Sequence, residues 1–257
     1  MKTIDLNADL GEGGGQDAVL MPLVTSANIA CGAHAGDADT MRASVELAQR
    51  HGVSIGAHTG FVDRENFGRV ERPIGPAEVA ALVTAQVMRL QEIAQAAGAV
   101  VGHVKLHGAL YNQVSRDREL SEAVVAAIRS AGKHLILYAL AGSELEKAAR
   151  RAPDFAVVAE AFADRTYQAD GTLTPRSRPE ALIHSPEAAA AQVRRIVREG
   201  FVRATDGTDV PLRAGTVCVH GDGPAAVALT TRLRAALEAD GIELAAPRGS
   251  GQNRRTP

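Results

Sequence analysis

Short apolar segments alternate with segments of helical spacing along almost the whole of this 257-residue chain. The strand-like segments, about seven in all, cover residues 3–7, 26–31, 53–57, 100–107, 134–140, 155–162 and 216–220. Strands that alternate with helices generally run parallel, because each helix returns the chain to the same end of the sheet. The alternation predicts an α/β fold, and it fits both a closed barrel and an open doubly wound sheet.

Residues that favour helix ends mark the expected helices. Asp37 is suited to cap a helix over 38–51, Gly52 to end it, and Pro76 to open a long helix that ends before Gly98. Further helices are expected over 118–131, 143–151, 186–199 and up to residue 239, with a hairpin turn at 205–210. We expect one domain over 1–246, followed by a disordered tail over 247–257.

Composition and charge argue against several functional classes. The formal net charge of -2 gives no signal for binding nucleic acid or an acidic membrane surface. No apolar run approaches the roughly 18–20 residues that span a membrane, and the first residues lack the apolar core of a signal peptide. Cys31 and Cys218 are too few for a disulfide framework and are expected to be buried structural residues. A cytoplasmic protein is therefore expected.

Ionisable residues gather at the carboxyl ends of the expected strands. Along the chain they are Asp9, Glu12, His34, His58, Lys105, His107, Glu160, Asp164, Arg165, His220 and Asp222, so four of the eight histidines lie at or just past a strand end. Barrels and open parallel sheets both carry their chemistry at this end of the strands. The distribution predicts an enzyme site there.

Two strands carry polar side chains on one face only. His103, Lys105 and His107 alternate with apolar residues in the fourth strand, and Cys218 and His220 do so in the last. In a barrel this polar face would point into the lumen near the mouth, which we favour over an exposed outer face. His103 is one pleat deeper than the other two and is expected to support or pack.

The fourth strand is expected to break at a glycine. Gly108 follows His107, and the break would let Tyr111 and Asn112 fold over the site.

Several kinds of chemistry fit this set of side chains. Imidazole and carboxylate groups of Asp9, His34, His58, His107 and His220 could hold a divalent metal ion, although no spacing such as HExxH marks such a site. The same groups could act as acid and base on an amide or similar carbonyl. Lys105 could stabilise a developing oxyanion or a phosphate.

Seven sequence blocks together resemble the signature of one family. They are residues 5–12 (DLNADLGE), 26–36 (SANIACGAHAG), 56–58 (GAH), 67–69 (FGR), 104–112 (VKLHGALYN), 162–167 (FADRTY) and 218–222 (CVHGD). In this order and over nearly the whole chain, they resemble the LamB/YcsF family. Its members are known as lactam utilisation proteins or as the A subunit of bacterial 5-oxoprolinase.

The resemblance implies a distorted (β/α) barrel of seven strands, similar to the glycoside hydrolase/deacetylase superfamily. It implies ATP-dependent opening of 5-oxo-L-proline to L-glutamate, in which the family member acts with the 5-oxoprolinase subunits B and C. ATP with Mg²⁺ is the only cofactor that it implies. Thr59 and Leu106 stand where the family commonly has proline. Neither change removes an ionisable group, so they bear only on local backbone and substrate preference.

Strand-end position and residue type suggest roles for this reaction. Cations for phosphate are expected among Lys105, Arg69 and Arg165, a base for water from Asp9, Glu160 or a histidine, and an acid for the leaving nitrogen from His107 or His220. Further substrate or phosphate contacts are expected from Asn7, Glu12, Asn28, His34, His58, Tyr111, Asn112, Asp164 and Asp222. A tightly bound metal, if used, is expected on Asp9, His34 and His58.

Two other functions fit the same residues. One is a metal-dependent deacetylase or amidohydrolase that works alone, which loss of activity with a chelator would reveal. The other is a non-catalytic binding or regulatory subunit, which would bind a small molecule without turnover. The set of His, Asp and Lys side chains at the strand ends argues against the second.

Overall fold

The computed structural model describes residues 2–220 and 226–248. Seven parallel strands form a barrel in the order β1-β2-β3-β4-β5-β6-β9, and β9 pairs back onto β1 to close it. They are β1 (Thr3–Leu10), β2 (Ser26–Ala30), β3 (Ser54–Thr59), β4 (Val101–Leu106), β5 (Ile136–Leu140), β6 (Ala156–Phe162) and β9 (Thr216–His220). The expected barrel of seven strands is confirmed, and the open sheet is excluded.

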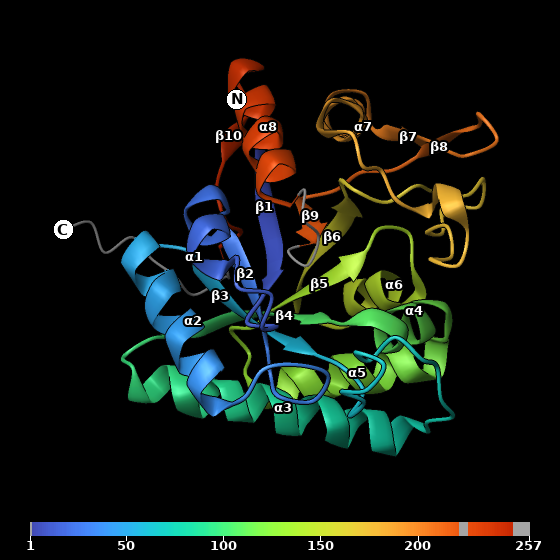
Figure 1. The fold of residues 1–257 in the computed structure, drawn as a ribbon. Helices are drawn as coiled ribbons and strands as arrows, with labels where there is room; N and C mark the ends of the chain where they lie inside the picture. Colours follow the sequence, from blue (N-terminus) through green and yellow to red (C-terminus); the bar gives the residue numbers. More distant parts are fainter. Residues whose placement is uncertain (1, 221–225, 249–257) are drawn as a thin grey trace.

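Helices cover the outside of the barrel, as Figure 1 shows. The longer ones in the described ranges are α2 (Ala38–His51), α3 (Pro76–Ala96), α5 (Arg118–Ala131), α6 (Glu144–Arg151), α7 (Pro186–Glu199) and α8 (Ala226–Ala239). Neighbours along the chain pack together, α3 on α5, α5 on α6 and α7 on α8. Their buried faces meet the outward side chains of the strands, such as Leu6 and Ala8 of β1.

Short elements complete the fold. They are α1 (Asp17–Leu20), η1 (Met21–Leu23), α4 (Gly108–Arg116), η2 (Pro179–Ala181), the antiparallel hairpin of β7 (Phe201–Arg203) and β8 (Asp209–Pro211), and β10 (Glu243–Leu244). The hairpin confirms the turn expected at 205–210. β10 pairs with the start of β1 outside the closed ring.

The helix ends follow the sequence signals. The Asp37 side chain accepts a hydrogen bond from the Thr40 amide at 2.8 Å and caps α2, and Gly52 ends that helix with φ +66°. Asp117 caps α5 in the same way. These local signals fixed most helix boundaries to within one residue, because a cap is decided by the two or three residues around it.

The structure corrects several expected boundaries. β1 runs to Leu10 rather than residue 7, and β3 runs to Thr59, so His58 lies within the strand. β4 ends at Leu106, and a helix that was not expected, α4, follows at once. The expected disordered tail falls mostly on residues 249–257, which lie outside the described part of the chain.

Polar side chains fill the amino end of the barrel interior. The Asp5 carboxylate accepts hydrogen bonds from the hydroxyls of Thr25 at 2.6 Å, Ser26 at 2.7 Å and Thr216 at 2.6 Å, and Ser26 contacts Tyr138 at 3.1 Å. Burial raises the pKa of Asp5, although these hydroxyls partly offset it. This buried network closes the barrel at the end where the strands begin.

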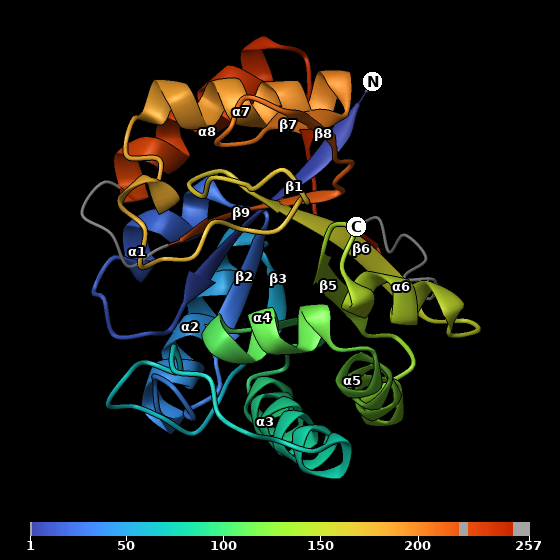
Figure 2. The ribbon, with the colours of Figure 1, turned by 90° about the vertical axis from the view of Figure 1, so that its right-hand side faces the viewer.

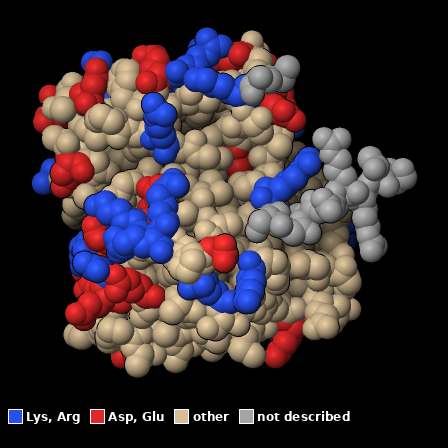
Figure 3. All heavy atoms as spheres, turned by 180° about the vertical axis from the view of Figure 1, so that it is seen from behind, with Lys and Arg blue, Asp and Glu red and all other residues tan. Residues whose placement is uncertain are grey.

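The surface matches the modest net charge. On the face drawn in Figure 3, most of the described surface is neutral, and groups of basic side chains lie beside groups of acidic ones. Among the described residues, no helix is both long and apolar enough to cross a membrane.

Candidate active site

The carboxyl ends of the strands open into a cavity of about 700 Å³. In Figure 2, α4 and the segment after β6 lie on the viewer's side of the barrel strands. The cavity is lined from the strand ends by Asp9, His58, Lys105 and His220, from α4 by Tyr111, Asn112, Ser115 and Arg116, and from the segment after β6 by Arg165, Gln168, Thr172 and Arg176. Its size is typical of pockets for small molecules and cofactors.

Lys105 is the central cation of the site. Its Nζ donates to Asp9 Oδ1 at 2.8 Å and to Cys218 Sγ at 2.8 Å, and it lies 3.1 Å from Glu160 Oε1. Burial alone would lower the pKa of Lys105, but the two carboxylates hold that pKa well above its usual range. The ammonium is therefore charged, and its charge is balanced inside the barrel.

Glu160 lies below Lys105, away from the cavity. It accepts hydrogen bonds from Asn7 Nδ2 at 3.0 Å and from Tyr111 Oη at 2.8 Å, and its side chain is fully buried. Asn28 Nδ2 in turn bridges Asn7 Oδ1 and Asp9 Oδ1, at 2.7 and 2.8 Å. These groups form a continuous network that fixes the position of Lys105.

His103 occupies the interior below the site, where the sequence placed it. Its Nε2 donates to Asn28 Oδ1 at 2.9 Å, and its ring stacks on Tyr138 with centroids 4.2 Å apart. Burial, with repulsion from Lys105, lowers the pKa of His103 to about 3, so the ring is neutral. Gly56 faces this ring so closely that a Cβ would lie 2.0 Å from Nε2.

Beside Asp9 lie the side chains that we call the histidine cluster (Glu12, His34, His58 and His107). Glu12 Oε1 lies 3.2 Å from His34 Nε2, 3.6 Å from His107 Nδ1 and 3.7 Å from His58 Nε2. Burial lowers the pKa of His34 to about 3 and that of His107 well below its usual range. The rings of His34 and His107 are therefore neutral near pH 7, and they stack at 3.8 Å.

His220 forms a separate pair with Asp164, which follows the neighbouring strand β6. Its Nδ1 lies 2.8 Å from Asp164 Oδ2, and its ring stacks on Phe162 with centroids 5.5 Å apart. Burial alone would raise the pKa of Asp164, but the imidazole of His220 lowers it. The carboxylate fixes the orientation of the ring at one nitrogen, which leaves Nε2 as the nitrogen able to exchange a proton with a ligand.

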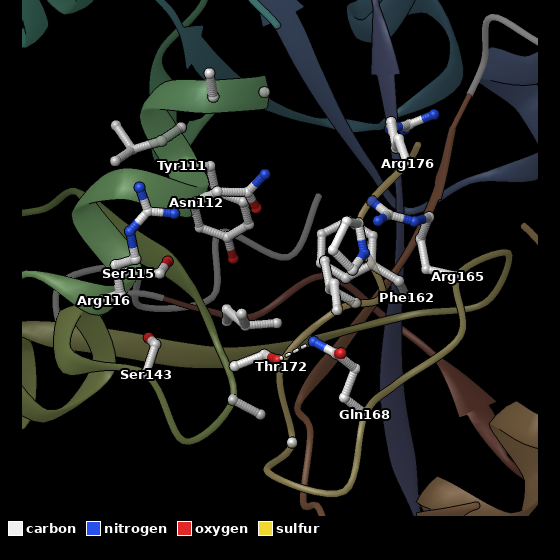
Figure 4. Close-up of a pocket in the computed structure, with 18 of the residues that line it drawn as sticks. Tyr111, Asn112, Ser115, Arg116, Ser143, Phe162, Arg165, Gln168, Thr172 and Arg176 are labelled. Carbon is white, nitrogen blue, oxygen red and sulfur yellow. Dashed lines mark hydrogen bonds between the residues drawn. The ribbon is translucent and has the colours of Figure 1, made fainter. Parts of the chain in front are cut away.

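Arginines from the segment after β6 line one side of the cavity. Figure 4 shows Arg165 and Arg176 next to each other, across the cavity from Arg116 and Tyr111 of α4. Arg165 donates to the carbonyls of Thr174 and Ala181, and burial, with repulsion from Arg176, lowers its pKa to about 10. Within the described residues, neither Arg165 nor Arg176 forms an ion pair.

The structure brings most of the expected residues to this end of the barrel. Those at the cavity are Asp9, His58, Arg69, Lys105, His107, Tyr111, Asn112, Arg165 and His220, and those packed behind them are Asn7, Glu12, Asn28, His34, Glu160 and Asp164. Asp222 lies outside the described residues. Cys31 and Cys218 are buried, as expected, and burial raises the pKa of Cys31 to about 12.

Sequence reasoning missed part of the cavity wall. Arg176, Gln168 and Thr172 lie in the irregular segment after β6, and Gln168 Nε2 donates to Thr172 Oγ1 at 2.9 Å, as drawn in Figure 4. Ser115 and Arg116 lie on α4, which the sequence did not predict. Only their position in the chain could have indicated these residues, because a long segment that follows a barrel strand lies at the open end of the barrel, around the site.

The fold is a closed parallel α/β barrel, and its buried ionisable groups lie at the carboxyl ends of the strands. The chain is therefore an α/β-barrel protein, a class whose functional residues lie at that end. Residues 4–251 match the model of the LamB/YcsF family. The chain belongs to this family, which confirms the resemblance seen in the sequence.

Known relatives cover nearly the whole chain. The A subunit of 5-oxoprolinase from Methylococcus capsulatus is 51% identical over 250 residues, which are 95% of this chain and 96% of that protein. The crystal structure of the lactam utilization protein from Thermus thermophilus matches with a TM-score of 0.89 and 44% identity, over 96% of this chain and all of that one. The crystal structure of a protein from Enterococcus faecalis V583 that is named for cellobiose-phosphate cleavage matches with a TM-score of 0.60 and 17% identity, over 95% of this chain and 97% of that one. This likeness shows the fold alone.

Proposed function

We propose that this chain is the A subunit of a cytoplasmic, ATP-dependent 5-oxoprolinase and acts with subunits B and C. The overall reaction converts 5-oxo-L-proline, ATP and two waters to L-glutamate, ADP and phosphate. The observation that carries the proposal is the cavity itself. It combines cationic side chains, a buried Lys–Asp pair and an oriented histidine in a family whose relatives are named for lactams and 5-oxoprolinase.

The chemistry explains why such a site needs both cations and proton carriers. A five-membered lactam is a stabilised amide, which water attacks slowly. Transfer of the γ-phosphoryl group of ATP to the lactam oxygen turns the ring carbon into a good electrophile. Water then adds to this carbon, and the ring C–N bond breaks to give an acyl phosphate. A second water releases phosphate from the acyl phosphate and completes L-glutamate.

The arginines are the groups best suited to a phosphate. Arg176 repels Arg165, and an anion bound between the two side chains would relieve that repulsion. The Lys105 ammonium is already balanced by Asp9 and Glu160. We therefore assign Lys105 mainly to holding Asp9 in place and to polarising the lactam oxygen.

The cavity also has room for more than a five-membered ring.

Proton transfers can be assigned from the same geometry. Asp9 Oδ2 lies 3.3 Å from His58 Nε2, at the cavity wall, and is the group we assign as base for water. His220, held by Asp164, is the acid we assign to the leaving ring nitrogen. Glu160 is saturated with hydrogen bonds and lies away from the cavity, so it supports the site from below.

The decisive experiment measures L-glutamate and phosphate released from 5-oxo-L-proline. The chain is assayed alone, with subunits B and C, and with both plus Mg-ATP. We expect equimolar glutamate and phosphate only in the last mixture. Glutamate release by the chain alone, without ATP and abolished by a chelator, would instead establish the metal-dependent amidohydrolase. Binding of 5-oxo-L-proline with no turnover in any mixture would establish a binding subunit.

A further inference from the structure

We propose that the histidine cluster is a metal centre in which Glu12, His34, His58 and His107 bind one divalent first-row transition-metal ion beside the cavity. Imidazole and carboxylate ligands of this kind suit Zn²⁺, Co²⁺, Mn²⁺ or Fe²⁺. The sequence suggested ligands among Asp9, His34, His58, His107 and His220, and first of all Asp9, His34 and His58. The structure gathers His107 with His34 and His58, and it adds Glu12 in place of Asp9.

The spacing of the ligand atoms fits one ion. One atom from each of the four side chains lies within 4.8 Å of all the others. Ligands about 2.0–2.1 Å from a tetrahedral ion lie about 3.3 Å from one another. The distances of 2.9 Å between the two nearest nitrogens, and of 3.2, 3.6 and 3.7 Å to Glu12 Oε1, lie on both sides of this value.

Hydrogen bonds fix the tautomers of two rings. His107 Nε2 lies 2.9 Å from the Phe67 carbonyl oxygen, and His58 Nδ1 lies 3.3 Å from the Lys105 carbonyl oxygen. A carbonyl oxygen can only accept, so both of these nitrogens carry the proton and donate. The other nitrogens, His107 Nδ1 and His58 Nε2, are then lone-pair atoms that face each other at 2.9 Å. Backbone carbonyls orient metal-binding imidazoles in this way in many proteins.

Two facing lone pairs at this distance call for a proton or a metal ion between them. A single proton shared by His58 and His107 would satisfy that pair alone. It would not explain why His34 Nε2 and Glu12 Oε1 converge on the same point from two other loops. The buried Nδ1 of His34 has no partner in the described residues, so this ring is not placed by a hydrogen bond on its far side. A four-coordinate ion accounts for all four groups.

Two glycines pack the rings of the cluster tightly. A Cβ at Gly60 would lie 2.7 Å from His34 Nδ1, and a Cβ at Gly68 would lie 2.9 Å from His34 Cβ and 3.2 Å from His107 Cδ2. Because these loops carry no side chain at the two positions, they close directly on the rings and hold them. Preorganised ligands of this kind favour binding of the ion over rearrangement of the rings.

The metal site extends the proposed function but does not depend on it. An ion at this place would act as a Lewis acid next to Asp9 and the cavity. Its binding is measured on the chain alone, without ATP, 5-oxo-L-proline or partner subunits. Loss of the ring-opening activity and loss of metal binding are therefore separate outcomes.

The test uses Co²⁺ as a spectroscopic probe. The full chain is freed of metal with a chelator, which is then removed, and titrated with Co²⁺ while its visible absorption is recorded. We expect the intense bands of a four- or five-coordinate ion, saturating at one equivalent per chain, and displacement of these bands by Zn²⁺. Absence of such bands, or binding without a stoichiometric end point, would overturn the proposal.

Variants locate the ion. Glu12→Gln and His107→Gln should each weaken Co²⁺ binding at least about tenfold and alter the spectrum, whereas His51→Gln, at an exposed histidine of α2, should bind as the unmodified chain does. Circular dichroism checks that each variant is folded. If His107→Gln fails to fold, Glu12→Gln carries the test because it preserves the shape of the side chain. Binding by a folded Glu12→Gln variant equal to that of the unmodified chain contradicts the proposal.

Discussion

Lys105 is the residue on which the barrel interior most depends. It is a buried cation between two buried carboxylates, Asp9 and Glu160. Removing one partner of a buried ion pair leaves an uncompensated charge, which costs far more than the pair contributes. Its first role is therefore structural, and a loss of activity in a Lys105 variant has to be separated from a loss of fold.

We expect Lys105→Met to lower the free energy of unfolding by about 3–5 kcal/mol. The measurement is equilibrium denaturation in urea, followed by circular dichroism. Lys147→Met, at an exposed lysine paired with Glu144 on α6, is the matched control and should leave the stability unchanged. Equal stability of the two variants would mean that Asp9 and Glu160 need no cation.

Asp164 should contribute stability that depends on pH. The imidazole of His220 lowers the pKa of Asp164 in the folded chain, against the effect of burial. Such a carboxyl adds stability above its unfolded pKa of about 3.9, and that stability is lost as pH falls through the folded value. We expect Asp164→Asn to be less stable than the unmodified chain at pH 7, with the difference shrinking below about pH 4. Denaturation at several pH values measures this, and a difference independent of pH would refute it.

His220 should matter for turnover more than for binding. As the assigned acid for the ring nitrogen, its replacement in His220→Gln should lower kcat for glutamate release about 10²–10⁴-fold, with little change in KM. The assay uses the complex assembled with its partners. His184→Gln, at an exposed histidine, is the control. A KM effect without a kcat effect would assign His220 to substrate binding instead.

Among the elements, α4 shows how a single glycine positions one wall of the cavity. Gly108 has φ +53°, and a Cβ there would lie 2.7 Å from the Gly68 carbonyl oxygen. The Ala109 amide donates to that same oxygen at 3.0 Å. The turn therefore joins α4 to the loop after β3 and aims Tyr111 at Glu160.

Gly108→Ala should destabilise the fold by more than the cost of placing alanine at a left-handed φ. Gly98 has φ +72° with open space around it, so Gly98→Ala measures the conformational cost, roughly 1–2 kcal/mol. We expect Gly108→Ala to exceed this cost because of the added clash, and to weaken turnover because α4 must shift. Thermal unfolding of both variants, with Gly14→Ala as a control in open space, provides the comparison. Equal losses for Gly98→Ala and Gly108→Ala would show that the loop moves freely.

The strands and capped helices were predictable because their signals are local. Alternation in 216–220 and the Asp37 cap need only a few neighbouring residues, and both expectations were confirmed. α4 was missed because it opens on Gly108 directly after a strand, without a capping side chain. Arg176 was missed because the segment around it has no periodicity.

For the molecule as a whole, the sequence could not predict which of the site residues lie next to one another. The histidine cluster depends on the register of four neighbouring strands, such as His58 beside Lys105. A one-residue shift in any of these pairings would turn side chains to the other face. Sequence reasoning therefore located the correct end of the barrel, and seven blocks identified the family, but the grouping of Glu12 with His34, His58 and His107 emerged only from the closed ring.

Closure of the barrel should make unfolding cooperative. Each of the seven strands pairs on both sides, because β9 returns to β1. The chain has no tryptophan, and Tyr111, Tyr138 and Tyr167 are all buried. We expect tyrosine fluorescence and far-ultraviolet circular dichroism to report the same midpoint in urea. An earlier change in fluorescence would show that the barrel interior loosens before the helices melt.

The Asp5 network at the closed end of the barrel determines where substrate can enter and product can leave. With Ser26, Thr216 and Tyr138 sealing that end, whatever reaches the cavity must enter and leave at the same side. Product must then leave through the same opening by which substrate enters. A protein that docks over this opening would control both substrate binding and product release, so the rate at which that protein uncovers the opening would limit the turnover of the complex.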